Sequence, residues 1–180
     1  MTGRPLSYTE YAVLGLLMRG KRSGYDLNKL AKETIAYFWT PARSKIYASL
    51  QRLVEEGLIN GETVVQDTRP DKQLYRITPA GRKALRAWLD AEEIVSGPGR
   101  HGLLLKLFFG EYADPDALRG HIERWKQRAE HQLAAFEAIE GHIDKRAFFF
   151  PYLTLRHGIE DARSTIEWAD EVLALLRRRR

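Results

Sequence analysis

The chain has 180 residues, with 29 Lys and Arg against 24 Asp and Glu and a formal net charge of +5. Its hydrophobic fraction of 44% is typical of a globular protein, and its length excludes a barrel of about 250 residues. No apolar run is long enough to span a bilayer, no secretory signal follows Met1, and no cysteine is present. These features predict a cytoplasmic protein that makes no membrane contact.

The positive charge lies in the first half of the chain. Residues 1–90 carry 15 Lys and Arg and 9 Asp and Glu, whereas residues 91–180 carry 14 and 15. This asymmetry favours a polyanion such as nucleic acid as the partner of the first half. A solvated surface with a chance imbalance of charge is the alternative.

Capping and turn signals predict the elements of the first half. Ser7 and Glu10 form a capping box that begins one helix, and Ser23-Gly24-Tyr25 begins the next. Thr40-Pro41 and Thr78-Pro79 each predict an N-cap with proline at the first helical position, and Gly57 predicts a left-handed stop. The elements expected after Thr40 are a helix at 42–56, strands around 58–65 and 74–77 joined by a polar tip at 66–72, and a helix from 78 to 89.

Three helices followed by a two-stranded wing are typical of a winged helix-turn-helix, which we place at residues 1–93. A cluster of Ser, Gly and Pro at residues 94–99 predicts the domain boundary. Residues 94–180 then form a helical dimerisation domain that could also bind an effector. The predicted fold is therefore mainly α with a small β-hairpin.

The second half predicts a short buried helix at 103–109 and two long helices, at 114–143 and 150–178, that pair as an antiparallel hairpin. The last helix carries an apolar seam with heptad spacing. We expect part of this seam to serve a homodimer, because two helices alone form a thin core. The expected dimerisation residues are Ile159, Ala162, Ile166, Ala169 and Leu173. The alternative is a seam that faces only its neighbour in the same chain.

The sequence shows no Walker loop, dinucleotide fingerprint or nucleophile elbow, and no two histidines lie three or four residues apart. We therefore predict neither an enzyme nor a metal or cofactor site.

The third helix and the wing carry the side chains that suit DNA. Arginine and lysine neutralise phosphates or bind guanine, hydroxyl groups donate to phosphate oxygens, and glutamine pairs with adenine. The expected DNA-binding residues of the helix are Arg43, Ser44, Lys45, Tyr47, Gln51 and Arg52. Those of the wing are Arg69 and Lys72, on either side of Pro70. An ordinary solvated hairpin is the alternative for the wing.

Several motifs resemble the PadR family of transcriptional regulators. They are Tyr11–Leu17 with Ser23-Gly24-Tyr25-Asp26-Leu27, Phe38-Trp39, Ile46-Tyr47 with Glu56-Gly57-Leu58-Ile59, and Arg69-Pro70-Asp71 with Tyr75-Arg76-Ile77-Thr78 and Gly81. The second half is similar to the helical extension of a virulence-activator-like subgroup, through Leu107-Phe108-Phe109 and Ile166-Glu167-Trp168-Ala169. Gln73 departs from the family, which more often has a basic residue at this place in the wing.

The resemblance implies a homodimeric regulator, usually a repressor, that binds a double-stranded operator and responds to phenolic or other small hydrophobic effectors. Trp39, Trp125 and Trp168 are candidates to line an effector pocket, although core packing is the alternative for each. A helical protein–protein adaptor that does not bind DNA is the alternative function.

Overall fold

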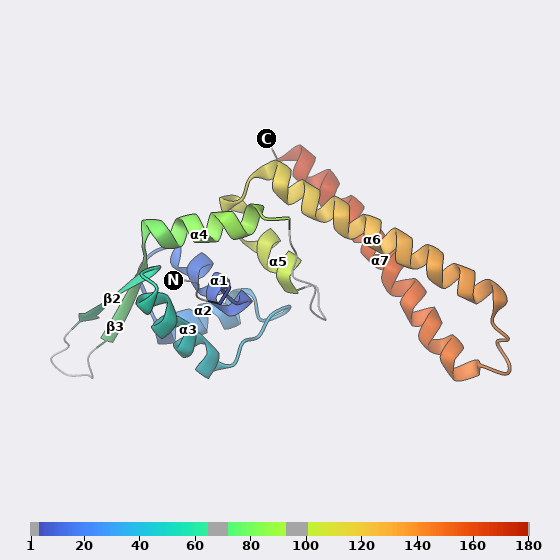
Figure 1. Cartoon of the computed structure of the whole chain (residues 1–180), viewed down its shortest axis with the longest axis horizontal. Coiled ribbons are helices and arrows are strands. Elements are labelled where there is room, and N and C mark those ends of the chain that lie inside the picture. Colours follow the sequence, from blue (N-terminus) through green and yellow to red (C-terminus); the bar gives the residue numbers. More distant parts are fainter. Residues whose placement is uncertain (1–3, 65–71, 93–100, 180) are drawn as a thin grey trace. The chain divides into compact units, whose positions relative to one another are not determined.

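The computed structural model describes residues 4–64, 72–92 and 101–179, which form two compact units, Met1–Asp114 and Pro115–Arg180 (Figure 1). The boundary expected at residue 94 falls outside the described residues. Helix α5 (His101–Phe108) belongs to the first unit because Leu105 and Phe109 lie in its core. The second unit therefore consists of the helical hairpin alone.

The first unit has the order of helices and strands of a winged helix-turn-helix. Its elements are α1 (Tyr8–Leu17), β1 (Arg22–Ser23), α2 (Gly24–Thr34), α3 (Arg43–Glu55), β2 (Ile59–Val64), β3 (Lys72–Ile77), α4 (Pro79–Asp90), α5 and a 3-10 turn at Gly110–Tyr112. Figure 1 shows β2 and β3 projecting beside α3 as the wing. The fold class predicted from the sequence is confirmed.

Helix starts follow the predicted caps in three of four cases, and Thr78 with Pro79 begins α4 as expected. Capping boxes at Ser7 and Ser23 begin α1 and α2 as expected. The prediction for Thr40-Pro41 was wrong: α3 begins at Arg43, and its N-cap is Ala42. The Thr40 hydroxyl instead donates to the carbonyl of Ala36, so it serves the end of the preceding segment.

The sheet has one strand more than predicted. β2 and β3 pair antiparallel from Ile59 opposite Ile77 to Val64 opposite Lys72. The two-residue strand β1 adds to the other edge of β3, giving the order β1-β3-β2. A strand this short carries no alternating pattern that a sequence could reveal.

The core of the first unit joins all five helices to the sheet. Tyr11 stacks on Trp88, with ring centroids 4.4 Å apart and planes 9° from parallel. Gly15 lets the ring of Phe109 approach α1, because a Cβ there would lie 2.5 Å from that ring. Helix α5 is thereby packed against α1.

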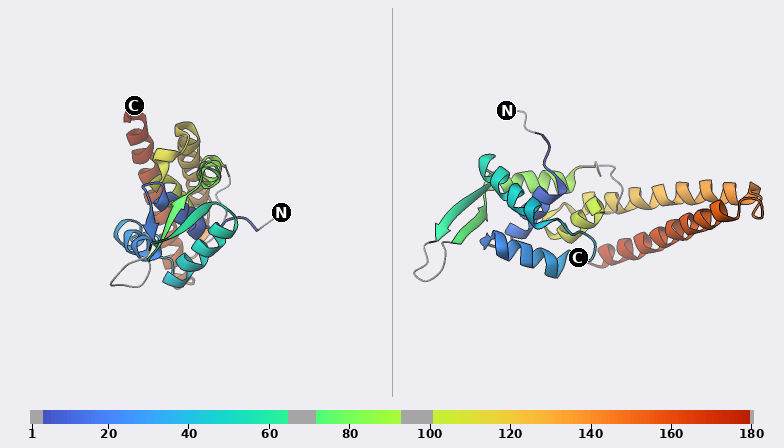
Figure 2. Two further views of the ribbon diagram at one scale, coloured as in Figure 1. Left: turned by 90° about the vertical axis from the view of Figure 1, so that its left-hand side faces the viewer. Right: turned by 90° about the horizontal axis from the view of Figure 1, so that it is seen from below.

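The second unit pairs α6 (Pro115–His142) with α7 (Phe149–Arg178) as the predicted antiparallel hairpin (Figures 1 and 2). The seam expected to serve the dimer is mostly used within the hairpin. Ile159, Ala162, Ala169 and Leu173 are buried in the single chain, and Ile166 is half-buried. Two helices have only each other to cover their apolar stripes, so the seam packs internally first.

Candidate nucleic-acid interface

The outer face of α3 carries five of the six DNA-binding residues predicted on this helix. Its inner positions Ile46, Ser49, Leu50 and Leu53 are buried, which fixes the rotation of the helix. The side chains on the exposed face are Arg43, Ser44, Lys45, Tyr47 and Gln51. Their shared exposure follows from the helical period, since the apolar stripe lies on the opposite side.

The N-terminus of α3 favours the binding of an anion. No side-chain hydrogen bond caps it among the described residues, and its first turn contains no acidic residue. The first backbone N–H groups of a helix point outward and give this end a partial positive charge. Arg43 lies over the ring of Tyr47, 5.5 Å from its centroid, and no described acidic side chain pairs with Arg43 or Lys45.

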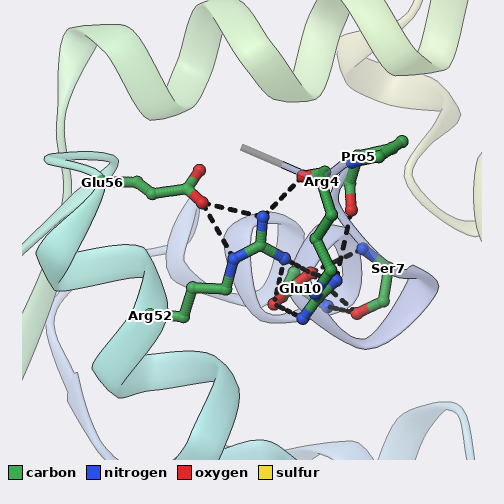
Figure 3. A network of polar contacts seen from close by, with 6 residues as sticks. All are labelled: Arg4, Pro5, Ser7, Glu10, Arg52 and Glu56. Carbon is green, nitrogen blue, oxygen red and sulfur yellow. Dashed lines mark hydrogen bonds and ion pairs between the residues drawn. The ribbon is translucent and has the colours of Figure 1, made fainter. Parts of the chain in front are cut away.

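Unlike the other five DNA-binding residues predicted on α3, Arg52 forms hydrogen bonds and ion pairs within the protein (Figure 3). Its Nη1 donates to both carboxylate oxygens of Glu10 at 3.0 Å, its Nη2 donates to the carbonyl of Arg4 at 2.6 Å, and its Nε donates to Glu56 at 2.8 Å. Only 17% of the side chain is exposed. This guanidinium ties α3 to α1 and to the N-terminal segment, and its donors are directed into the unit rather than outward.

Glu10 is the centre of this network. It is 1% exposed and accepts hydrogen bonds from the backbone N–H and hydroxyl of Ser7 and from Arg4. Burial on its own raises the pKa of Glu10, but hydrogen bonds from Ser7 and Arg4 and the charge of Arg4 outweigh it, so the pKa lies below its usual value. The carboxylate is therefore held ionised at neutral pH.

Lys72 begins β3 opposite Val64, at the end of the strand pair next to the tip, and forms an ion pair with Asp26 of α2 at 3.0 Å. The hydrogen bond from Lys72, with those from Ser23, holds the pKa of Asp26 below its ordinary value. Gln73 accepts a hydrogen bond from the Thr63 hydroxyl at 2.8 Å across the strand pair. Arg69 lies outside the described residues.

A polar notch beside α3 was not predicted from the sequence. It encloses about 300 Å³ and is lined by Arg4, Ser7, Thr9, Glu10, Lys45, Ala48 and Ser49. Lys45 and Arg4 meet here although 41 positions separate them in the chain. The only sequence signal for Arg4 is its place just before the capping box, and that signal does not indicate which helix it approaches.

The three candidate effector residues do not share one unit. Trp39 packs against the core of the first unit, whereas Trp125 and Trp168 are half-buried on α6 and α7. An ion pair of 2.7 Å between Lys126 and Asp170 brings these two tryptophans to similar levels along the hairpin. None of the three is among the residues that line the notch.

In the part of the chain that the structure describes, no helix combines the length and the apolar character needed to cross a membrane. No group of three His, Asp or Glu side chains in that part is placed to hold a metal ion.

Two family models match adjacent parts of the chain. The model described as "Transcriptional regulator PadR-like family" matches residues 13–87, and the one described as "Virulence activator alpha C-term" matches residues 100–177. Solved structures similar to this chain include Bacillus subtilis PadR in complex with operator DNA, at 25% identity with 94% of this chain and 99% of that chain covered, and a TM-score of 0.49. Bacillus subtilis PadR in complex with p-coumaric acid is 24% identical over the same shares of the two chains, with a TM-score of 0.45.

Two relatives are similar along almost the whole length. The "Negative transcriptional regulator PadR" of Bacillus subtilis is 27% identical over 175 residues, which are 93% of this chain and 96% of the relative. The "Probable transcriptional regulator Rv1176c" of Mycobacterium tuberculosis is 31% identical over 189 residues, with 94% and 98% covered. Given this identity across nearly its full length and the match of both family models, the chain belongs to the PadR-like family of transcriptional regulators.

Proposed function

We propose that the protein is a homodimeric transcriptional repressor that binds operator DNA through the exposed face of α3. The observation that carries the proposal is the start of this helix, where Arg43 and Lys45 are exposed, no acidic residue lies in the first turn, and neither cation has an acidic partner among the described residues. Membership of a family of regulators, which are not enzymes, favours this function over the adaptor. Acting on chromosomal DNA, the protein would work in the cytoplasm.

In this proposal α3 enters the major groove and the wing approaches the DNA backbone or the minor groove. Arg43 and Lys45 supply phosphate contacts, and Gln51, further along the helix, is the candidate for reading a base edge. Arg52 acts within the protein by holding α3 in place. Two copies of α3 would meet successive major grooves roughly 34 Å apart on a near-palindromic site.

Removing the two cations tests the interface. We expect Arg43→Ala with Lys45→Ala to weaken binding to specific and random duplexes by at least about tenfold, because charge-assisted contacts to phosphate are lost. The salt dependence should also fall by about one unit of log–log slope per lost contact. Gel shifts at several salt concentrations measure both quantities.

The matched control removes the same charge from exposed positions of α4, as Lys83→Ala with Arg86→Ala. This variant should bind like the parent, and both variants should keep the parent's size in solution. Unchanged DNA binding by the Arg43 and Lys45 variant would refute the assignment of this face.

We propose further that an aromatic acid relieves repression, as a response to phenolic effectors is expected of this family. Titration with p-coumaric acid should change the tryptophan fluorescence and, at the same concentrations, release a bound duplex. A fluorescence change without release would identify a ligand that is not the effector. No response to a panel of phenolic acids and planar cations would leave a regulator without an effector of this class.

A further inference from the structure

The polar notch beside α3 contains a buried hydroxyl group that the protein itself does not use. Ser49 lines the notch and is 5% exposed, yet no described residue forms a hydrogen bond with its hydroxyl. The hydroxyl oxygen still reaches the surface, since in the described part of the chain the one fully enclosed side-chain nitrogen or oxygen that lacks a partner is Nε of Arg22. Buried polar groups normally have partners, so a free one that opens onto a notch indicates a partner from outside the chain.

Two further side chains of the notch have polar groups available for a ligand. Thr9, the second residue of α1, lines the notch, and its hydroxyl has no partner among the described residues. Lys45 also lines it, one helical turn before Ser49 and so beside it on the surface of α3. The notch therefore offers two hydroxyl donors and one ammonium group, contributed by two helices.

Glu10 also lines the notch, but its charge is already balanced (Figure 3). Its carboxylate oxygens accept hydrogen bonds from the guanidinium groups of Arg4 and Arg52. The second carboxylate of this network, Glu56, pairs with Arg52 at 2.7 Å. The two carboxylates and the two guanidinium groups offset one another, so Lys45 leaves the notch with an uncompensated positive charge.

We propose that the polar notch holds one phosphate of the DNA backbone. Lys45 supplies the positive charge, and the hydroxyls of Thr9 and Ser49 donate hydrogen bonds to the phosphate oxygens. The inference rests on the proposed function and adds the start of α1 to the DNA interface. A phosphate held in this way fixes the position of α3 on the duplex but reads no base.

The place of the notch favours a phosphate of DNA over a free anion of the same chemistry. The notch adjoins the exposed face of α3, because Lys45 belongs to both and Ala48, which also lines the notch, is exposed. A recognition helix in the major groove has a phosphate backbone along each side, and in helix-turn-helix docking another helix crosses that backbone. The start of α1 is placed to serve as that second helix.

Ser49→Ala tests the buried hydroxyl. We expect the variant to bind a fluorescent duplex of random sequence about five- to tenfold more weakly, because a hydrogen bond to a charged group is lost. The salt dependence should match that of the parent, since no charge is removed, whereas Lys45→Ala should lower the log–log slope by about 0.9. The unfolding temperature of Ser49→Ala should be at or above that of the parent, because the hydroxyl makes no hydrogen bond in the folded chain. Fluorescence anisotropy at several salt concentrations and a thermal melt measure these quantities.

Thr9 allows a rescue experiment and a matched control. Thr9→Val should weaken duplex binding, and Thr9→Ser, which keeps the hydroxyl, should restore it. The control is Thr34→Val, at a half-buried position near the end of α2, where the hydroxyl donates to the Leu30 carbonyl at 2.7 Å. This variant should bind the duplex like the parent.

The outcomes separate the notch from the proposed function. Parent-like duplex binding by both Ser49→Ala and Thr9→Val overturns the phosphate site and leaves the regulator intact, whereas a parent that binds no duplex refutes the proposed function itself. Weaker binding accompanied by a lower unfolding temperature of Ser49→Ala would assign the hydroxyl a structural role and overturn the site. Inorganic phosphate, compared with sodium chloride of equal ionic strength, tests the free anion. If it raises the unfolding temperature of the parent but not of Ser49→Ala, while their duplex affinities are equal, the notch binds a free anion and the proposal is wrong.

Discussion

Glu10 shows how a single carboxylate joins three segments that are distant in sequence. It completes the cap of α1, holds Arg4 of the N-terminal segment and pairs with Arg52 of α3 at 3.0 Å (Figure 3). Because α3 carries the proposed DNA-binding face, Glu10 and Arg52 are positioning residues. They orient the helix without needing to touch DNA.

We expect Glu10→Gln to lower the free energy of unfolding by about 1–3 kcal/mol at pH 7, because hydrogen bonds to a charged acceptor are replaced by weaker ones. The pKa of Glu10 is lowered in the folded state, so its stabilisation is present above the unfolded pKa and is lost as the pH falls through the folded pKa. The parent and the variant should therefore converge in acid. Urea denaturation at pH 7 and in acid measures the difference in the free energy of unfolding between the parent and the variant. A difference that is the same at both pH values would contradict the stabilising role of the ionised Glu10 carboxylate.

Arg52 also marks the limit of sequence reasoning at this scale. The helical period correctly predicts which residues of α3 face outward, and Arg43, Ser44, Lys45, Tyr47 and Gln51 do so. It could not show that Arg52 is recruited inward, because its partner Glu10 is 42 positions away and is known only from the tertiary structure.

At the scale of elements, two glycines show opposite roles in helices. A Cβ on Gly81 in α4 would lie 2.1 Å from the carbonyl oxygen of Leu58, so only glycine lets α4 approach the start of the wing. Gly141 in α6 has nothing within 4 Å of the same position. Replacing glycine by alanine therefore tests packing at Gly81 and helix propensity at Gly141.

Gly81→Ala should destabilise the first unit by about 1–3 kcal/mol, as for an overpacked contact. Gly141→Ala should stabilise the hairpin by roughly 0.5–1 kcal/mol, because alanine is the better helix former. Thermal unfolding followed by circular dichroism gives both values. Equal effects of the two substitutions would mean that the Leu58 contact does not constrain α4.

Most elements were predictable because their signals are local, as the caps at Ser7, Ser23 and Thr78 illustrate. Contacts between elements were predictable only for consecutive elements, as in the wing and the helical hairpin. Lys106 interrupts an apolar run in the sequence, yet it is 1% exposed and donates to the Ala91 carbonyl at 2.6 Å. It therefore fastens α5 to the carboxyl end of α4, a role that requires knowing which helices are neighbours.

At the scale of the whole molecule, the chain combines a basic winged-helix unit with a hairpin whose seam is largely satisfied internally. The heptad pattern predicted the hairpin. It could not show which seam residues pack within the chain and which contact a partner chain, because an apolar seam has the same spacing in either kind of packing. In the described part of the hairpin, large apolar side chains are exposed at the turn, in Phe148–Phe150 and Leu153, and also at Ile139 and Leu175.

Sedimentation of a fluorescent duplex with increasing amounts of protein tests the central claim most directly, namely that two chains bind duplex DNA together through α3. At low salt we predict a complex of two chains per duplex that dissociates as salt is raised, and that forms poorly with the Arg43→Ala, Lys45→Ala variant. A protein that sediments as a single chain and leaves the duplex unbound even at low salt would contradict the account.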